Sequence, residues 1–442
     1  MAIVVLIVAL VIEAGCAATR WVMPVWSGRG RSTARIVMWG VFWLLTLTGI
    51  ISWSFRWYGL GALLSVWALK EAWLLVHERE TPQGASHSRI VLQAGAAVLL
   101  VFIAVTPVLI FPPYELPEPT GKYPVTTAFD TFTDEDRVEA YSANGTHRSV
   151  NVEFWYPQDA DGVFPLVVFS HGGLGIRKSN LSLYRELAGH GYVVGSIDHP
   201  YHAFWTQDVQ GQLTFVSWDY FRELGREDAR SDKQQSLTYY QRWMDTRMGD
   251  IDFVINTVLA YASAGVGGVY GLVDTDRIGV MGHSLGGSAA LGIGRQRSDI
   301  GAVIALEAPF MHDIVGVEDD GFVFVNEDYP VPVLNVYSDS AWSHLSEWPQ
   351  YARNAALLSD PHTIAYNVHI SGVGHLGLTD LALSSPLVVQ LLDGTRPTRQ
   401  GTESLDIINR LSLRFLDHYL KRQGDFPGQW VADDPGILVT LP

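Results

Sequence analysis

Cysteine is nearly absent from this chain of 442 residues, since Cys16 is the only one. A single thiol can form neither an intrachain disulfide nor a thiolate metal cluster, which excludes disulfide scaffolds and cysteine-based zinc sites. No group of His, Asp and Glu has the spacing of metal ligands either. We therefore expect a protein that needs no metal and no cofactor.

Basic residues are scarce as well: 30 Lys and Arg stand against 46 Asp and Glu, a net charge of −16. The imbalance is confined to one part of the chain. Residues 1–112 hold 8 basic and 4 acidic side chains, whereas the remainder holds 22 basic and 42 acidic. A strongly acidic domain repels phosphate backbones, so nucleic acid is not an expected partner.

Residues 1–112 contain four apolar segments, roughly 2–18, 36–55, 57–76 and 90–111. Each is close to the ~20 residues that a helix needs to cross the hydrocarbon of a bilayer. We predict a transmembrane anchor of about four spans. Lys70 and Glu71 interrupt the third segment, and we interpret them as side chains near a helix end that reach toward the lipid headgroups. The alternative is that they mark a transport path.

The distribution of arginine predicts the orientation of this anchor. Basic connections face the cytoplasm, and two connections qualify here, the one after the first segment and the one after the third. The last segment then leads outward, which predicts a multi-pass protein of the cell membrane with everything after residue 112 outside the cytoplasm. The arginines concerned are Arg20, Arg29, Arg31, Arg35, Arg79 and Arg89.

Beyond a Pro- and Glu-rich linker at 113–122, short apolar runs alternate with helical stretches. This alternation predicts an α/β domain over 123–442, with a mostly parallel sheet and helices on both faces. The polar, aromatic-rich stretch 201–233 is expected to be an inserted lid. Expected strands are 150–156, 166–170, 192–198, 277–282, 302–306, 333–338 and 366–370; expected helices are 181–190, 237–262, 288–295 and 405–420.

The segment Gly282-His283-Ser284-Leu285-Gly286 has the form G-x-S-x-G and lies between an expected strand and an expected helix. This context is typical of a nucleophile elbow, in which a sharp turn exposes the serine and glycines let neighbouring backbone pass closely. Ser284 is the predicted nucleophile. The alternative is a glycine-rich turn that only packs.

A second glycine cluster, Ser170-His171-Gly172-Gly173-Leu174-Gly175, directly follows the expected strand 166–170. Hydrolases with a nucleophile elbow bind the oxyanion with one N–H from the residue after the serine and another from such a loop. We predict Leu285 and Gly173 as the donors, with Leu174 as the next choice for the second.

The general base should follow the nucleophile in the chain, with the acid between them. His375 ends the glycine-rich turn after the last expected strand and is the predicted base. Two carboxylates end preceding strands, Glu307 and Asp339. Either could accept a hydrogen bond from the imidazole, so the residues alone leave both open.

Together these motifs resemble the plasma (type II) platelet-activating factor acetylhydrolase family and its bacterial α/β-hydrolase relatives, some of which look similarly membrane-anchored. The likeness covers roughly 120–420 and not the membrane segments. It favours Glu307 as the acid, because the family has an L-D-A-like context where this chain has Leu306-Glu307-Ala308, while the change from Asp to Glu keeps Asp339 open. The matching pieces are FSHGG at 169–173, GYVV at 191–194 with Asp198-His199, GHSLGG at 282–287, ALEA at 305–308 and GVGHLGLTDL at 372–381.

The resemblance implies a serine esterase that cleaves carboxylic esters through an acyl-enzyme, with short or oxidised acyl chains of phospholipids as its substrate class. Two other functions remain open: a peptidase or amidase on the same fold, and a non-catalytic extracellular sensor or binding module. The oligomeric state is not predictable from the sequence.

Overall fold

The computed structural model describes residues 2–22, 27–77, 87–142, 144–394, 396–428, 434 and 436–440. The chain divides into two compact units. One comprises residues 1–114 together with 384–388, and the other comprises 115–383 together with 389–442. The sequence places the division two residues earlier, at 112, and does not anticipate that 384–388 group with the first unit.

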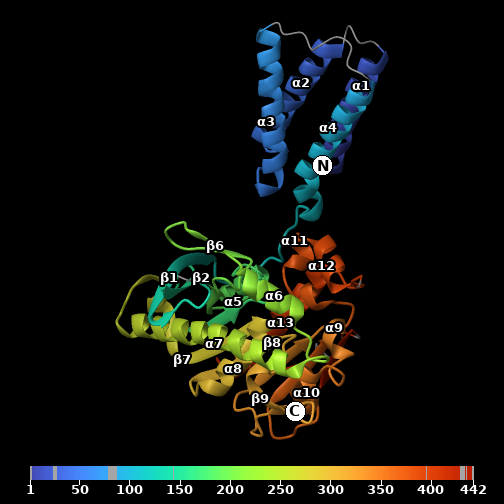
Figure 1. Cartoon of the computed structure of the whole chain (residues 1–442). Helices are drawn as coiled ribbons and strands as arrows, with labels where there is room; N and C mark the ends of the chain where they lie inside the picture. The colour runs from blue at the N-terminus through green and yellow to red at the C-terminus, as the bar shows by residue number, and fades with distance from the viewer. Residues whose placement is uncertain are drawn as a thin grey trace. The chain divides into compact units, whose positions relative to one another are not determined.

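The N-terminal unit is made of four helices, labelled in Figure 1. They are α1 (Ala2–Val22), α2 (Ser27–Leu47), α3 (Phe55–Val76) and α4 (His87–Ile110). In the described part of the chain, α3 and α4 are long and apolar enough to cross a membrane, by length and composition alone.

The helix α2 begins well before the apolar segment predicted from the sequence, 36–55, and it ends earlier, at Leu47. Arg29, Arg31 and Arg35 therefore lie within α2, and Arg20 lies within α1, rather than in a connection. The prediction was wrong on this point because α2 continues through Arg31 and Arg35, which form ion pairs with acidic residues of other helices. Arg79 lies outside the described residues.

Arg35 is buried inside the bundle. Its guanidinium is 2 % exposed, donates to both carboxylate oxygens of Glu13 at 2.8 and 3.0 Å, and donates to Glu71 at 3.2 Å. Glu71 also accepts from Ser32 Oγ at 2.7 Å, and Trp67 covers the guanidinium at 4.0 Å. Glu71 is only 4 % exposed, so the expectation that it reaches toward the headgroups is wrong; its partner lies inside the bundle.

The second unit is built on a nine-stranded sheet in the order β1-β2-β4-β3-β7-β8-β11-β12-β13. The six strands from β4 to β12 are parallel to their neighbours, while β1, β2 and β13 run antiparallel at the edges. The strands are β1 (Val125–Val138), β2 (His147–Pro157), β3 (Phe164–Ser170), β4 (Val193–Asp198), β7 (Val273–His283), β8 (Ile300–Leu306), β11 (Val333–Tyr337), β12 (Ala365–Ile370) and β13 (Ile437–Thr440).

All seven expected strands and all four expected helices are present, with shifts of a few residues at their ends. The sequence missed the edge strand β1, whose polar positions weaken the apolar signal, and the edge strand β13, which has only 4 residues. The four expected helices are α5 (Leu181–Gly189), α7 (Lys233–Ser263), α8 (Leu285–Gln296) and α13 (Gly401–Tyr419). The shorter ones are α9 (Asp339–Trp342), α10 (Ala352–Leu357), α11 (Leu381–Ser384) and α12 (Pro386–Asp393).

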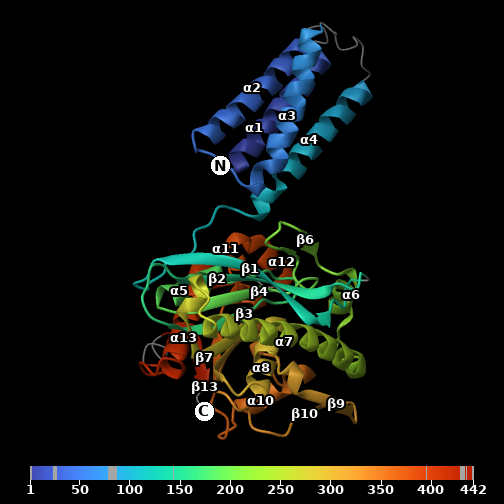
Figure 2. The same ribbon diagram turned by 90° about the vertical axis from the view of Figure 1, so that its left-hand side faces the viewer.

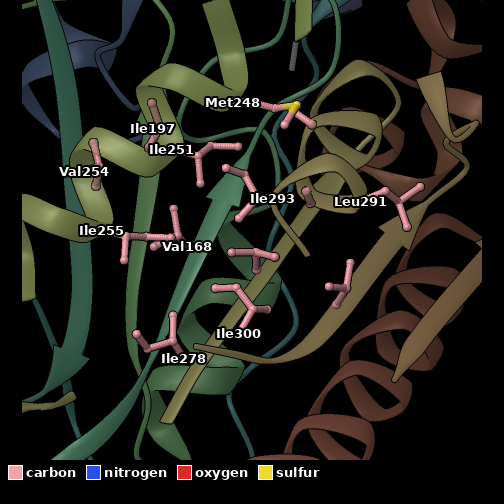
Figure 3. Close-up of a cluster of buried hydrophobic side chains, with 14 of the residues drawn as sticks. Val168, Ile197, Met248, Ile251, Val254, Ile255, Ile278, Leu291, Ile293 and Ile300 are labelled. Atoms are coloured by element: carbon pink, nitrogen blue, oxygen red, sulfur yellow. The ribbon is translucent and has the colours of Figure 1, made fainter. Parts of the chain in front are cut away.

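Alternate residues of the central strands supply two hydrophobic cores, one on each face of the sheet. Leu166 and Val168 of β3 belong to the core under α7 and α8, whereas Val167 and Phe169 belong to the core under α5 and α13. Figure 2 shows α7 running along the sheet. Figure 3 shows its Ile251, Val254 and Ile255 beside strand residues such as Val168. This two-sided burial explains why the central strands read as continuous apolar runs.

The predicted lid, 201–233, is not irregular throughout. It contains a short hairpin of β5 (Trp205–Gln207) and β6 (Leu213–Phe215), followed by the helix α6 (Trp218–Arg226). A second hairpin, β9 (Ile314–Glu318) and β10 (Gly321–Phe324), follows β8. Each of these two hairpins forms a two-stranded sheet separate from the nine-stranded sheet.

Replacing Arg35 with Met tests the buried charge cluster. The substitution leaves the carboxylates of Glu13 and Glu71 without their guanidinium, and we expect it to lower the free energy of unfolding by about 3 kcal/mol. Unfolding of the purified full-length protein by denaturing detergent, followed by tryptophan fluorescence, measures this. The matched control is Lys70→Met, because Lys70 is exposed; equal losses in the two variants would contradict the assignment.

Candidate active site

Ser284 lies in the turn between β7 and α8, with φ 53° and ψ −125°. The left-handed φ is uncommon for a residue with a side chain and is typical of a nucleophile elbow. The flanking glycines have no room for a side chain. A Cβ on Gly282 would lie 2.3 Å from the Gly286 backbone, and one on Gly286 would lie 2.0 Å from the carbonyl oxygen of Ser170.

The loop after β3 lies against this elbow. A Cβ placed on Gly172 would be 2.7 Å from His283 Nδ1 and 3.4 Å from Ser284 Cβ. Gly173 faces the side chain of Leu285, which a Cβ there would approach to 3.4 Å. The structure therefore brings the two predicted oxyanion donors, Gly173 and Leu285, to either side of the serine turn.

Neither donor is engaged elsewhere. Within the described ranges, no backbone or side-chain acceptor receives a hydrogen bond from the N–H of Gly173 or of Leu285. Leu285 is the first residue of α8, where backbone N–H groups have no acceptor within the helix and carry the positive end of its dipole. Two N–H groups beside one hydroxyl can stabilise a negatively charged oxygen. Leu174, the other candidate, adopts the left-handed conformation of the loop with φ 60°.

His375 begins a short 3-10 turn after β12 and approaches the elbow from the opposite side. Its carbonyl lies 3.0 Å from His283 Nε2, and the two imidazole rings are 4.5 Å apart. His283 directly precedes Ser284, so the predicted base contacts the residue before the predicted nucleophile.

Of the two candidate acids, Glu307 is the one that contacts His375. Its Oε1 lies 2.7 Å from His375 Nδ1, and its Oε2 accepts from the backbone N–H of Ser338 at 2.6 Å. The side chain of Glu307 is 2 % exposed, and its backbone has φ 50°. Both carboxylate oxygens are therefore hydrogen-bonded, and these two bonds hold the carboxylate toward the imidazole.

Asp339 has a different task. Its Oδ1 lies 2.8 Å from His369 Nε2, and its Oδ2 accepts from the N–H of Gly372 at 2.9 Å. Gly372 begins the turn that leads to His375, and the next residue after Asp339, Ser340, accepts from the N–H of His375 itself at 3.1 Å. Asp339 therefore orders the histidine loop from behind and does not contact the predicted base.

The environment of His375 favours its protonated form. Burial disfavours the imidazolium, but the hydrogen bond and charge of Glu307 outweigh this, so the pKa of His375 is raised above its usual value. The neighbouring His283 behaves in the opposite way. Burial and the nearby His375 lower the pKa of His283 well below the usual range, so this ring stays neutral.

The aromatic residues of the predicted lid divide into two groups. Tyr220 is fully buried, stacks on His202 at 3.9 Å, and places its hydroxyl 3.5 Å from a Cβ built on Gly173. Five others are exposed, so these five do not form an internal core for the lid. Their exposed fractions are 60 % for Phe204, 38 % for Trp205, 63 % for Phe215, 68 % for Trp218 and 44 % for Phe221.

A buried polar network behind the oxyanion loop was not predicted. Ser170 Oγ lies 2.8 Å from His199 Nε2, and His199 Nδ1 lies 2.9 Å from Asp250 Oδ2. Arg148 binds Asp250 through two of its nitrogens, at 3.0 and 2.6 Å. The only sequence signal for this network was the pair Asp198-His199 at the end of a strand. Among the described residues, no group of three or more His, Cys, Asp or Glu could hold a metal ion.

A mostly parallel sheet covered on both faces, with the serine turn after β7 and the histidine turn after β12, defines an α/β-hydrolase fold. Among solved structures, a ferulic acid esterase from Streptomyces cinnamoneus has the same fold, with a TM-score of 0.56 at 20 % identity. The match covers 74 % of this chain and 99 % of that one.

Residues 146–437, well over half of the chain, match the family described as platelet-activating factor acetylhydrolase, isoform II. The chain belongs to this family. Curated relatives are the platelet-activating factor acetylhydrolases of dog, 25 % identical over 278 residues, and chicken, 23 % identical over 298 residues. These alignments span 60 % and 62 % of this chain, and 59 % and 66 % of the dog and chicken proteins, respectively.

The raised pKa of His375 can be measured without assuming any activity. Diethyl pyrocarbonate modifies only neutral imidazole, and a raised pKa means that the imidazolium persists to higher pH. We expect the modification rate at His375, followed by peptide mass spectrometry, to rise with a midpoint above ~6.5. In Glu307→Gln, burial still lowers the pKa of His375, but the carboxylate that raises it is gone. The midpoint should therefore fall below that of the wild type.

Asp339→Asn is the matched control, since Asp339 contacts His369 instead, and its midpoint should equal that of the wild type. A midpoint that moves in Asp339→Asn and stays in Glu307→Gln would reverse the assignment of the two carboxylates.

Proposed function

We propose that this protein is a membrane-attached serine hydrolase that cleaves carboxylic esters, with Ser284 as nucleophile, His375 as base and Glu307 as the orienting acid. The observation that carries the proposal is the 2.7 Å hydrogen bond between His375 and Glu307, formed beside the strained turn of Ser284. Membership of the acetylhydrolase family and the esterase fold of a solved neighbour support the same reaction class.

In the first half of the reaction, Ser284 Oγ attacks the ester carbonyl while His375 Nε2 takes the hydroxyl proton. The carbonyl π electrons move to its oxygen, which the N–H groups of Leu285 and Gly173 stabilise. Glu307 remains ionised and stabilises the imidazolium through Nδ1. The tetrahedral adduct then collapses, the C–O bond to the alcohol breaks, and His375 returns its proton to the leaving oxygen.

The second half repeats these steps with water. His375 takes a proton from the water as it attacks the acyl-enzyme, and a second tetrahedral adduct forms in the same oxyanion hole. When that adduct collapses, the acid is released and Ser284 recovers its proton. Every step uses groups of the protein and water, so the proposed cycle needs no metal or cofactor.

As substrates we propose short or oxidised acyl chains esterified on phospholipids. The named relatives are platelet-activating factor acetylhydrolases, which supports acyl esters of a lipid as the class. The two apolar helices α3 and α4 support a location at a bilayer, where such a substrate is concentrated.

A fluorophosphonate probe tests the nucleophile. We expect stoichiometric labelling of the wild-type protein and none in Ser284→Ala, because only an activated serine attacks phosphorus at a useful rate. Mass spectrometry of the labelled peptide locates the adduct. Labelling that persists in Ser284→Ala would refute the proposed mechanism.

Kinetics test the acid and the substrate class together. With p-nitrophenyl acetate, Glu307→Ala should lose roughly 10⁴-fold in kcat, because the imidazole is no longer oriented or stabilised. Asp339→Ala is the control and should lose far less in kcat.

A panel of p-nitrophenyl esters of increasing chain length and peptide anilides distinguishes an esterase from a peptidase. Faster cleavage of the anilides would overturn the ester assignment.

For the membrane we propose four spans, α1 to α4, with the hydrolase unit outside the cytoplasm, because the arginine-bearing ends of the predicted spans face inward by the positive-inside rule. In a bacterial host, alkaline phosphatase fused after residue 442 should be active and a green fluorescent protein fused there should be dark. The opposite pattern would place the hydrolase unit in the cytoplasm.

A further inference from the structure

Arg247 is a fully buried arginine on α7, and its environment is unusual for a cation. Its relative exposure is 0 %, yet no carboxylate within the described ranges lies within 4.0 Å of its guanidinium. Nε has no hydrogen-bond partner among those residues. Arg148 and Arg35, the other buried arginines, each bind two carboxylates.

A buried charge without a counter-ion costs several kcal/mol of stability. The neutral groups around Arg247 offset only part of this cost. Arg247 Nη1 donates to the carbonyl of His171 at 2.5 Å, and Nη2 donates to the carbonyl of Gly172 at 3.2 Å. The Gly172 carbonyl also accepts from His171 Nδ1 at 2.7 Å and from the N–H of Gly175 at 3.1 Å. Among the described residues, Arg247 is therefore its one charged donor. A weaker contact at 3.4 Å joins Nη2 to the hydroxyl of Tyr220. The cation is therefore held against the oxyanion loop.

The surrounding titratable groups leave this charge uncompensated. Burial and then the charge of Arg247 lower the pKa of His171 and His202 well below the usual range, so both rings are neutral. Burial raises the pKa of Tyr220, which keeps its hydroxyl protonated. Asp250, an acid of the neighbouring network, is bound by Arg148, Arg137 and His199.

The hydrogen bond to Gly172 has a geometric consequence for the next residue. In a trans peptide the C=O of one residue and the N–H of the following residue point in opposite directions. Because Arg247, together with His171, binds the carbonyl of Gly172, the N–H of Gly173 is directed away from the guanidinium. A guanidinium on the carbonyl also polarises that peptide and strengthens its N–H as a donor.

We infer that Arg247 is a positioning residue that serves as buried counter-charge for the oxyanion formed at Ser284, acting through the peptide between Gly172 and Gly173. The negative charge that Arg247 lacks in the resting protein arises on the substrate oxygen during the reaction. Because this oxygen is charged only in the tetrahedral adduct, the interaction lowers the barrier without tightening substrate binding. The inference rests on the proposed function.

The test uses the full-length protein in detergent micelles, with p-nitrophenyl acetate as substrate and fluorophosphonate titration to count active sites. Arg247→Gln keeps a donor for the carbonyls and removes the charge. We expect its kcat per titrated site to fall by roughly 10- to 100-fold, below the 10²- to 10³-fold effect of removing an oxyanion donor itself. KM should change by less than about 3-fold, as expected for an interaction made only in the transition state.

A trifluoromethyl ketone provides the readout that a structural role would not move. It forms an anionic tetrahedral adduct with the serine, so its inhibition constant should rise in Arg247→Gln by the same factor as kcat/KM falls. Arg295→Gln is the matched control. Arg295 is an ion-paired arginine bound to Asp313 at 2.8 Å, and its removal should leave kcat per site and inhibitor affinity unchanged.

The outcomes separate the two proposals. If the wild type hydrolyses the ester and Arg247→Gln has the same kcat per titrated site, or an unchanged inhibition constant, the inference about Arg247 is wrong and the esterase function stands. If the wild type neither labels nor hydrolyses, both are wrong. Should Arg247→Gln fail to fold, Arg247→Met decides, since an apolar side chain of similar length removes the charge without burying a new polar group. Its kcat per titrated site and its inhibitor affinity should then fall together, and unchanged values would overturn the inference.

Discussion

The site depends on one close contact between two stretches of backbone. The elbow of Ser284 presses against the end of β3 so tightly that position 286 has no space for a Cβ beside the carbonyl of Ser170. This contact sets the distance between the nucleophile and the loop of Gly172 and Gly173. Glycine is required at these positions because only a backbone without side chains can approach another so closely.

Buried polar groups around this contact hold the histidine and the loop after β3 in place. Glu307 holds His375 from one side with a carboxylate whose other oxygen is bound to the backbone, while Asp339 orders the same loop without contacting the ring. Arg247 donates to two carbonyls of the loop after β3, those of His171 and Gly172. Each of these groups is fixed by a second hydrogen bond, which is how a site keeps its geometry before a substrate arrives.

The helical unit shows where sequence patterns fail. Apolar length predicted four helices, but the boundaries of α2 were wrong because Arg35 was placed in the connection before the second segment. In the structure this arginine lies inside the bundle, where Glu13 and Glu71 bind it from two other helices. A hydropathy average over a sequence window treats each charged residue as unfavourable in a membrane. It contains no information on ion pairs between residues far apart in the sequence, such as Arg35 with Glu13 and Glu71.

The central strands, the crossover helices and the motif residues Ser284 and His375 were determined by local sequence, because two-sided burial and tight turns impose apolar runs and glycines that are readable in order along the chain. The residues alone left the choice between Glu307 and Asp339 open, since both end adjacent parallel strands, and only the family resemblance favoured Glu307. Only the tertiary structure decided which carboxylate meets the imidazole and which meets His369. Arg247 gave no local signal at all, because a basic residue within a helix resembles a solvated one until the fold buries it.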